Sequence, residues 1–168
     1  MTLSVQETVK TTVRRSLVAL DAMLDKAAVF ATNKGFDVGV LLGSRLAPDM
    51  FPLTRQVQLA SDTAKGMAGR LAGQTLPVFE GVETTLPELK ERIARTLAFV
   101  DSIDPAAFDG AEQREIRIPT RAEVLEFRGD EYLLAFALPN LYFHVTAVYM
   151  ILRHNGVELG KRDFLGAR

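Results

Sequence analysis

The stretch DEYLLAFALPNLYFHVTAVYMILRHNG, residues 130–156, decides the fold, because it is the most apolar run in the chain. Within it, Asn140 and His144 are four residues apart, the spacing that places two side chains on the same face of a helix. Polar groups on an apolar helix need hydrogen-bonding partners, since an unpaired buried polar group is costly. The partners of these two residues therefore distinguish an active site, a ligand pocket and an ordinary core.

The same run is about long enough to cross a membrane. Pro139, His144 and Thr146 interrupt it, and three tyrosines lie along its length. This pattern favours a central helix that is buried on most sides in a globular protein. We therefore expect no membrane partner.

The composition is that of one soluble globular domain covering residues 1–168, with 48% apolar residues and a net charge of −1. The near-neutral charge argues against a general nucleic-acid binder, which would carry a basic excess. The chain has no cysteine, which removes disulfides and thiolate metal sites and fits a reducing compartment. Its first residues show no secretory signal, so we expect a cytoplasmic protein.

Apolar residues at helical spacing predict long helices over about 4–32, 50–72, 85–103 and 130–156. Thr85 and Glu88 form the pattern of a capping box, which marks a helix start. Two short alternating runs around Pro119 predict a small β-hairpin, which must pack on the helices because an isolated hairpin is marginally stable. The predicted fold is all-α, a four-helix up-down bundle with a small β-hairpin before the last helix.

The polar residues on these helices allow two interpretations each. Asn140 and His144 form either a satisfied core pair or part of a pocket at the bundle axis. Gln58 and Asp62, also four apart, form either a solvated face or part of the same pocket.

Arg92 is expected on an exposed ionic face of the third helix. One imidazole with amides is a poor zinc site, and Asp62 adds a carboxylate only if its face turns inward.

A resemblance to a known family rests on the last helix. The segments Asn140-Leu-Tyr-Phe-His144 and Ile151-Leu-Arg-His-Asn-Gly156 resemble the last helix of the DinB/YfiT-like superfamily, four-helix bundles regarded as metalloenzymes. The longer string PNLYFH…LRHNGVELGKRDFLG and the string MFPLTRQVQLASDTA look more specifically like an uncharacterised branch of that superfamily, a domain of unknown function. The resemblance covers essentially the whole chain and implies a homodimer.

The resemblance also implies a site. In this superfamily the last helix carries two histidines four apart, and a third comes from the second helix. Here Asn140 stands in place of the first histidine and Gln58 in place of the one on the second helix, while His144 is retained. The implied ligand-binding residues are Gln58, Asn140 and His144. The implied metal ligands are the same three, for a divalent ion such as zinc or nickel. Asp62, from our interpretation of the second helix, is an additional candidate ligand or base. Amides are weak donors compared with imidazole.

Three hypotheses follow, and the question of enzymatic activity stays open among them. The first is a small-ligand-binding or degenerate-site bundle with a polar pocket at Gln58, Asn140 and His144. The second is a divalent-metal-dependent transferase or hydrolase that acts on a small thiol-type substrate. The third is a structural or oligomerisation module, in which the Asn/His pair serves the specificity of the core.

Overall fold

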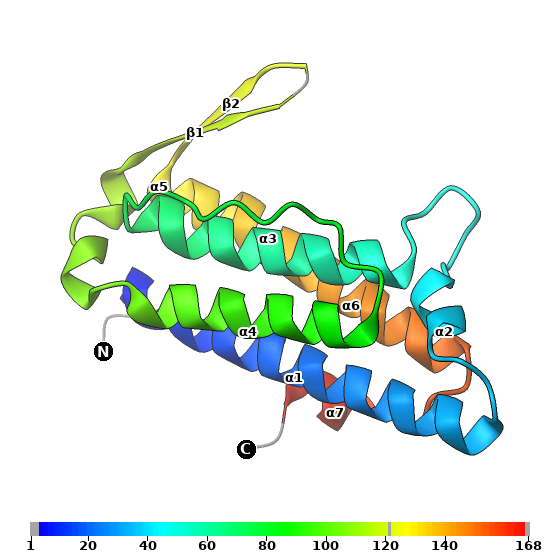
Figure 1. The fold of residues 1–168 in the computed structure, drawn as a ribbon. Helices are drawn as coiled ribbons and strands as arrows, with labels where there is room; N and C mark the ends of the chain where they lie inside the picture. The colour runs from blue at the N-terminus through cyan, green and yellow to red at the C-terminus, as the bar shows by residue number, and fades with distance from the viewer. Residues whose placement is uncertain (1–3, 121, 167–168) are drawn as a thin grey trace.

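The structure, a computed structural model, describes residues 4–120 and 122–166. Four long helices lie side by side in it: α1 (Val5–Lys34), α3 (Leu53–Leu71), α4 (Leu86–Ser102) and α6 (Leu138–His154) (Figure 1). The shorter elements are α2 (Gly39–Gly43), α5 (Gly129–Glu131), α7 (Lys161–Leu165), the 3₁₀ turns η1 (Pro105–Phe108) and η2 (Ala111–Gln113), the π-helical turn η3 (Tyr132–Ala137), and the strands β1 (Glu115–Pro119) and β2 (Val124–Arg128). The predicted helical architecture with a β-hairpin before the last long helix is confirmed.

Local capping explains where the helices begin. Ser4 accepts a hydrogen bond from the amide of Glu7 at 3.0 Å and starts α1. Thr85 and Glu88 form the predicted capping box, since the Glu88 carboxylate accepts from the Thr85 amide at 2.9 Å and the Thr85 hydroxyl accepts in return. Each cap satisfies amides that the first helical turn leaves without an intrahelical partner.

The directions of α3 and α4 differ from the predicted up-down alternation. The contacts between these two helices advance together along both: Asp62 pairs with Arg92, and further on Gly69 lies against the ring of Phe99. The two helices therefore run in the same direction, as Figure 1 also shows.

The connection over residues 72–85 makes this arrangement possible. It runs back along α3 in an irregular, extended form (Figure 1). An extended chain advances about 3.3 Å per residue and a helix 1.5 Å, so this segment is long enough to return along the whole of α3, which has 19 residues. The sequence marks the segment as a loop but does not say that it crosses the length of the molecule.

The apolar run that dominates the sequence forms α5, η3 and α6 as one continuous helix, Gly129–His154. Pro139 cannot donate a backbone hydrogen bond, and the turn before it adopts π-helical geometry, in which the Leu138 amide donates to the Leu133 carbonyl. The helix therefore accommodates its proline by a local change of hydrogen-bonding register. By length and composition alone this helix could cross a membrane, a property that it shares with core helices of soluble proteins.

The hairpin of β1 and β2 packs on the helices only at its base. Ile116 is 3% exposed, and its cross-strand partner Phe127 packs against Tyr132 and Phe136 at centroid distances of 6.0 and 5.2 Å. The other end of the hairpin projects away from the helices (Figure 1). The prediction that the hairpin packs on the helices thus holds for its base alone.

Candidate functional site

His144 is positioned by Gln56 of α3, which the sequence did not single out. The Nδ1 atom of His144 lies 2.8 Å from Oε1 of Gln56, and Gln56 is 2% exposed. The amide nitrogen of Gln56 donates to the Phe51 carbonyl at 3.4 Å, which turns Oε1 toward the imidazole. Because that oxygen can only accept, Nδ1 of His144 carries the proton and Nε2 of the neutral ring keeps its lone pair.

The surroundings of His144 keep the ring neutral. The imidazole is half-buried, and this burial, with the nearby Arg55 charge as a second cause, holds the pKa of His144 below its usual value of 6.5. The ring of Phe143 meets it edge-on at a centroid distance of 5.3 Å. His144 therefore offers an oriented hydrogen-bond acceptor, or a base, at neutral pH.

Asn140 makes no hydrogen bond to His144 among the described residues. Its amide nitrogen donates to the carbonyl of Phe136 at 2.9 Å, one turn earlier in the same helix. This bond lies at the junction between η3 and α6, where the change of register disturbs the backbone hydrogen bonds. In the structure Asn140 satisfies the backbone of its own helix.

Gln58 is buried and faces the connection between α3 and α4. Its Nε2 atom donates to the carbonyl of Gly81 at 3.2 Å and to Oε2 of Glu83 at 3.0 Å, while its Oε1 accepts from Nη1 of Arg55 at 3.0 Å. Gln58 thus fixes the connection against α3 and holds the guanidinium of Arg55.

Asp62 belongs to a network centred on Arg92. The Arg92 side chain is 1% exposed, and its Nη2 and Nη1 atoms pair with Asp62 at 2.8 Å and with Glu83 at 2.7 Å. Lys65 approaches Asp62 to 3.0 Å. The prediction of an exposed ionic face for Arg92 is wrong, because Arg92 lies buried between two carboxylates. The Asp62 side chain is 35% exposed and also pairs locally with Lys65.

An aromatic side chain covers this network. The ring of Phe79, from the connection 72–85, has the cationic groups of Lys65, Arg92 and Arg95 at 4.2, 5.2 and 4.4 Å from its centroid. Such cation–π contacts are favourable, and more so where water is excluded. The Arg92 network and Phe79 together hold the connection in place.

Comparison with protein families decides where the chain belongs. The model of a domain of unknown function, DUF1993, matches residues 6–165. The chain belongs to the DUF1993 family. A crystal structure of a DinB family member protein from Shewanella denitrificans is 46% identical to it, with a TM-score of 0.89, and the match covers 95% of this chain and 90% of that one. No curated protein matches the chain. The predicted resemblance to a DinB-like branch of unknown function is confirmed.

The residues of this DUF1993 protein do not suit the metal site that its DinB-like character implies. Gln58, Asn140, His144 and Asp62 each have different partners, and no hydrogen bond joins any two of them among the described residues. Within residues 4–120 and 122–166, no three His, Cys, Asp or Glu side chains are grouped so that they could hold a metal ion. A divalent ion at His144 would have one imidazole ligand, whereas zinc sites use three or four strong donors.

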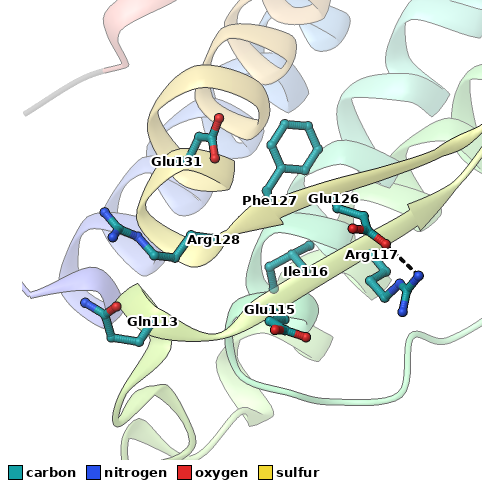
Figure 2. Close-up of a pocket in the computed structure, with 8 residues that line it drawn as sticks. All are labelled: Gln113, Glu115, Ile116, Arg117, Glu126, Phe127, Arg128 and Glu131. Atoms are coloured by element: carbon teal, nitrogen blue, oxygen red, sulfur yellow. Dashed lines mark ion pairs between the residues drawn. The ribbon is translucent and has the colours of Figure 1, made fainter.

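Three cavities in the part of the chain that the structure describes are lined by residues other than His144. One of about 410 Å³ lies at the base of the hairpin, between Ile116, Phe127 and Glu131 (Figure 2). A groove of about 930 Å³ separates α1 from α7, and a third cavity of about 280 Å³ lies where α1, α6 and α7 meet. None of the three is lined by His144. The exposed ring of Phe143 is the aromatic neighbour that a ligand of His144 would meet.

Two residues of this site, Gln56 and Arg55, were missed by the sequence interpretation. Both lie within three residues of Gln58, and no sequence motif indicates which of Gln56 and Gln58 contacts His144. The sequence feature that could have indicated Gln56 is its position four residues before Ala60, on the same face of the helix. In the structure both residues are buried, so this face is directed toward the interior.

Proposed function

We propose that this DUF1993 protein is a DinB-like four-helix bundle that binds a small polar ligand at His144. The observation that carries the proposal is the hydrogen bond of 2.8 Å between His144 and the buried Gln56. This hydrogen bond fixes one tautomer of His144 and leaves its Nε2 atom as an acceptor. The buried Gln56 amide thus orients the more accessible imidazole.

The other predicted ligand residues take supporting roles in this proposal. Gln58 holds Arg55, whose charge helps to lower the pKa of His144, through a bond of 3.0 Å, and Asn140 stabilises the helix that carries His144. The ring of Phe143, which is 57% exposed and meets the His144 ring edge-on, supplies apolar contact area beside it.

The experiment is a thermal-shift screen of small polar compounds against the wild-type protein and two variants. We expect compounds that stabilise the wild type to lose their effect in His144→Ala and to keep it in His154→Ala, the matched change at the chain's other histidine. Equal stabilisation of wild type and His144→Ala by every hit would contradict the proposal.

The alternative hypothesis, a metal-dependent transferase or hydrolase, has weaker support, because His144 is the one imidazole among the candidate metal ligands. It predicts about one zinc or nickel ion per chain in untagged protein purified without chelators. The ligand-binding proposal predicts no stoichiometric metal, because a single imidazole without further strong donors binds such ions poorly. Elemental analysis distinguishes the two.

A second candidate function, assembly into a homodimer, is favoured by the outer face of α6. No Asp, Glu, Lys or Arg occurs between Glu131 and Arg153, and Tyr142, Phe143 and Met150 are 44%, 57% and 52% exposed on that helix. An uncharged apolar face fits an identical face by self-complementarity. With the neighbouring Leu134, these side chains expose roughly 500 Å² per protomer, so that two copies reach the ~1,000 Å² of a specific interface.

Sedimentation analysis tests this assembly. We expect Met150→Glu to convert the dimer to a monomer, because burying a new charge on each side of the interface is costly. Val29→Glu, at an equally exposed apolar position on α1, is the control and should leave the dimer intact. A wild-type protein that sediments as a monomer at high concentration would exclude the homodimer.

A further inference from the structure

The groove of about 930 Å³ between α1 and α7 is a concave site that the proposed function does not use. One wall is a face of α1 between residues 14 and 22, and the other is α7 with the following Gly166. The two helices lie side by side in Figure 1. The volume is within the roughly 300–1,000 Å³ of small-molecule sites. His144 does not line this groove, so a ligand here is separate from the one proposed at His144.

Two contacts fix the direction of α7 relative to α1. Nζ of Lys26 donates to Oδ1 of Asp163 at 2.6 Å, and Nη2 of Arg15 donates to the carbonyl of Leu165 at 2.9 Å. The start of α7 is thus bound to the later of these two α1 residues, so the two helices are antiparallel along the groove. Because both walls are held by these contacts, the groove is present before a ligand binds.

Positive charge lies at both ends of the groove. Arg14 and Arg15 line it where α7 ends, whereas Arg162 lines it where α7 begins. Asp163 is the one carboxylate in the lining among the described residues, and it is paired with Lys26. The charge of Asp163 therefore does not cancel those of the three arginines.

The bonds that Arg14 and Arg15 already make leave both able to bind an anion. Arg15 donates to a neutral carbonyl, so its charge is not compensated there. Arg14 pairs with Asp101 at 2.7 Å, but the two side chains are 61% and 47% exposed and solvent screens the pair. Each guanidinium has five N–H donors and keeps further donors beyond Nη2.

The lining between these two ends is apolar. It consists of Val18, Ala19 and Ala22 of α1 with Leu165 of α7, and Val18 and Leu165 are 50% and 46% exposed. Ala22 comes about two helical turns after Arg15, a rise of roughly 10 Å along the groove. An alkyl chain that covered these side chains would remove apolar surface from water, which is favourable.

We infer that this groove binds a linear aliphatic dicarboxylate. One carboxylate binds Arg14 and Arg15, and the other binds Arg162. The alkyl chain between them lies on Val18. Guanidinium groups form paired, charge-assisted hydrogen bonds with carboxylates. A monocarboxylate would leave the cation at one end without a partner, and a short dicarboxylate would not reach both ends.

The test uses sebacate, a long linear dicarboxylate, and compares it with decanoate, dimethyl sebacate and succinate. We expect sebacate to shift the Val18 methyl signals in NMR spectra and to bind at least about tenfold more tightly than the other three. Arg162→Gln should weaken sebacate about tenfold, to the affinity of decanoate, because one carboxylate loses its partner. Arg45→Gln is the matched control, since it removes an exposed arginine that donates to backbone carbonyls outside the groove.

A second pair of variants tests the apolar part of the lining. Val18→Glu should remove sebacate binding, because it places a negative charge between the two carboxylates of the ligand. Val29→Glu, at a 60% exposed position on the same helix and outside the groove, should leave sebacate binding unchanged. Both positions are at least half exposed, so neither change disturbs the core.

The outcomes that contradict the inference are distinct. Equal affinities for sebacate and decanoate, or for sebacate in the wild type and Arg162→Gln, would refute the dicarboxylate class. No binding of sebacate, or binding that persists in Val18→Glu, would refute the groove as its site. Neither result bears on the ligand proposed at His144, because that residue does not line the groove.

Discussion

Replacing Arg92 by methionine is the sharpest perturbation of the network that holds the connection 72–85. The Arg92 side chain is 1% exposed and makes two charge-assisted hydrogen bonds, at 2.8 Å to Asp62 and at 2.7 Å to Glu83. Methionine keeps the apolar stem and removes the charge, so the loss comes from the ion pairs and not from a cavity.

The expected loss of stability in Arg92→Met depends on which partners Asp62 and Glu83 retain. Breaking a buried pair by removing one partner costs about 3–5 kcal/mol. Asp62 retains Lys65 at 3.0 Å and Glu83 retains Gln58 at 3.0 Å, and Nε of Arg92 is buried without a partner among the described residues. We therefore expect the low end, a decrease of about 3 kcal/mol in the free energy of unfolding.

Urea unfolding measures this decrease. The matched control is Arg14→Met, which removes an arginine whose side chain is 61% exposed and which pairs with Asp101 at 2.7 Å. Because solvent screens that pair, the control should change the free energy of unfolding by less than about 1 kcal/mol. A decrease below about 1 kcal/mol for Arg92→Met would refute the reasoning that its network stabilises the fold.

Three further predictions concern single groups. Burial by itself raises the pKa of Glu83, but hydrogen bonds and charge from Arg92 outweigh it and lower the pKa below 4.5. The stability that Glu83 contributes is therefore present above pH 4.5 and is lost as the pH falls through the pKa of the folded state. A titration of the free energy of unfolding toward acid pH should show a smaller loss of stability in Arg92→Met than in the wild type. Arg55→Gln should raise the pKa of His144 in an NMR titration, since it removes a nearby positive charge, and an unchanged pKa would contradict this. Thr85→Ala should lower the free energy of unfolding by about 1 kcal/mol in urea, because the capping box is lost, whereas Thr84→Ala, one residue earlier, should cost less.

The sequence predicts the helices and their caps because both depend on local features. The apolar spacing of α1 and the pairing of Thr85 with Glu88 involve residues within one or two turns of each other. The parallel course of α3 and α4 is different in kind. It depends on where the connection 72–85 lies on the surface of α3, and no local pattern encodes that position.

The candidate site shows the same limit. His144 is recognisable because it is a rare polar residue in an apolar helix. On α3, however, Gln56 and Gln58 are both buried, and each faces a different neighbour: Gln56 faces α6, and Gln58 faces the connection. Helical periodicity tells which residues are buried but not which element covers them, so the partner of His144 needed the structure.

The measurement that tests the central claim most directly is the state of the His144 imidazole at neutral pH, read from its ¹⁵N chemical shifts. We predict a neutral ring with the proton on Nδ1, and a shift of the Nε2 signal when a compound that stabilises the protein in the thermal-shift screen is added. In Gln56→Leu the preference for this tautomer should weaken. A protonated ring at pH 7, or a proton on Nε2 in the wild type, would contradict the account.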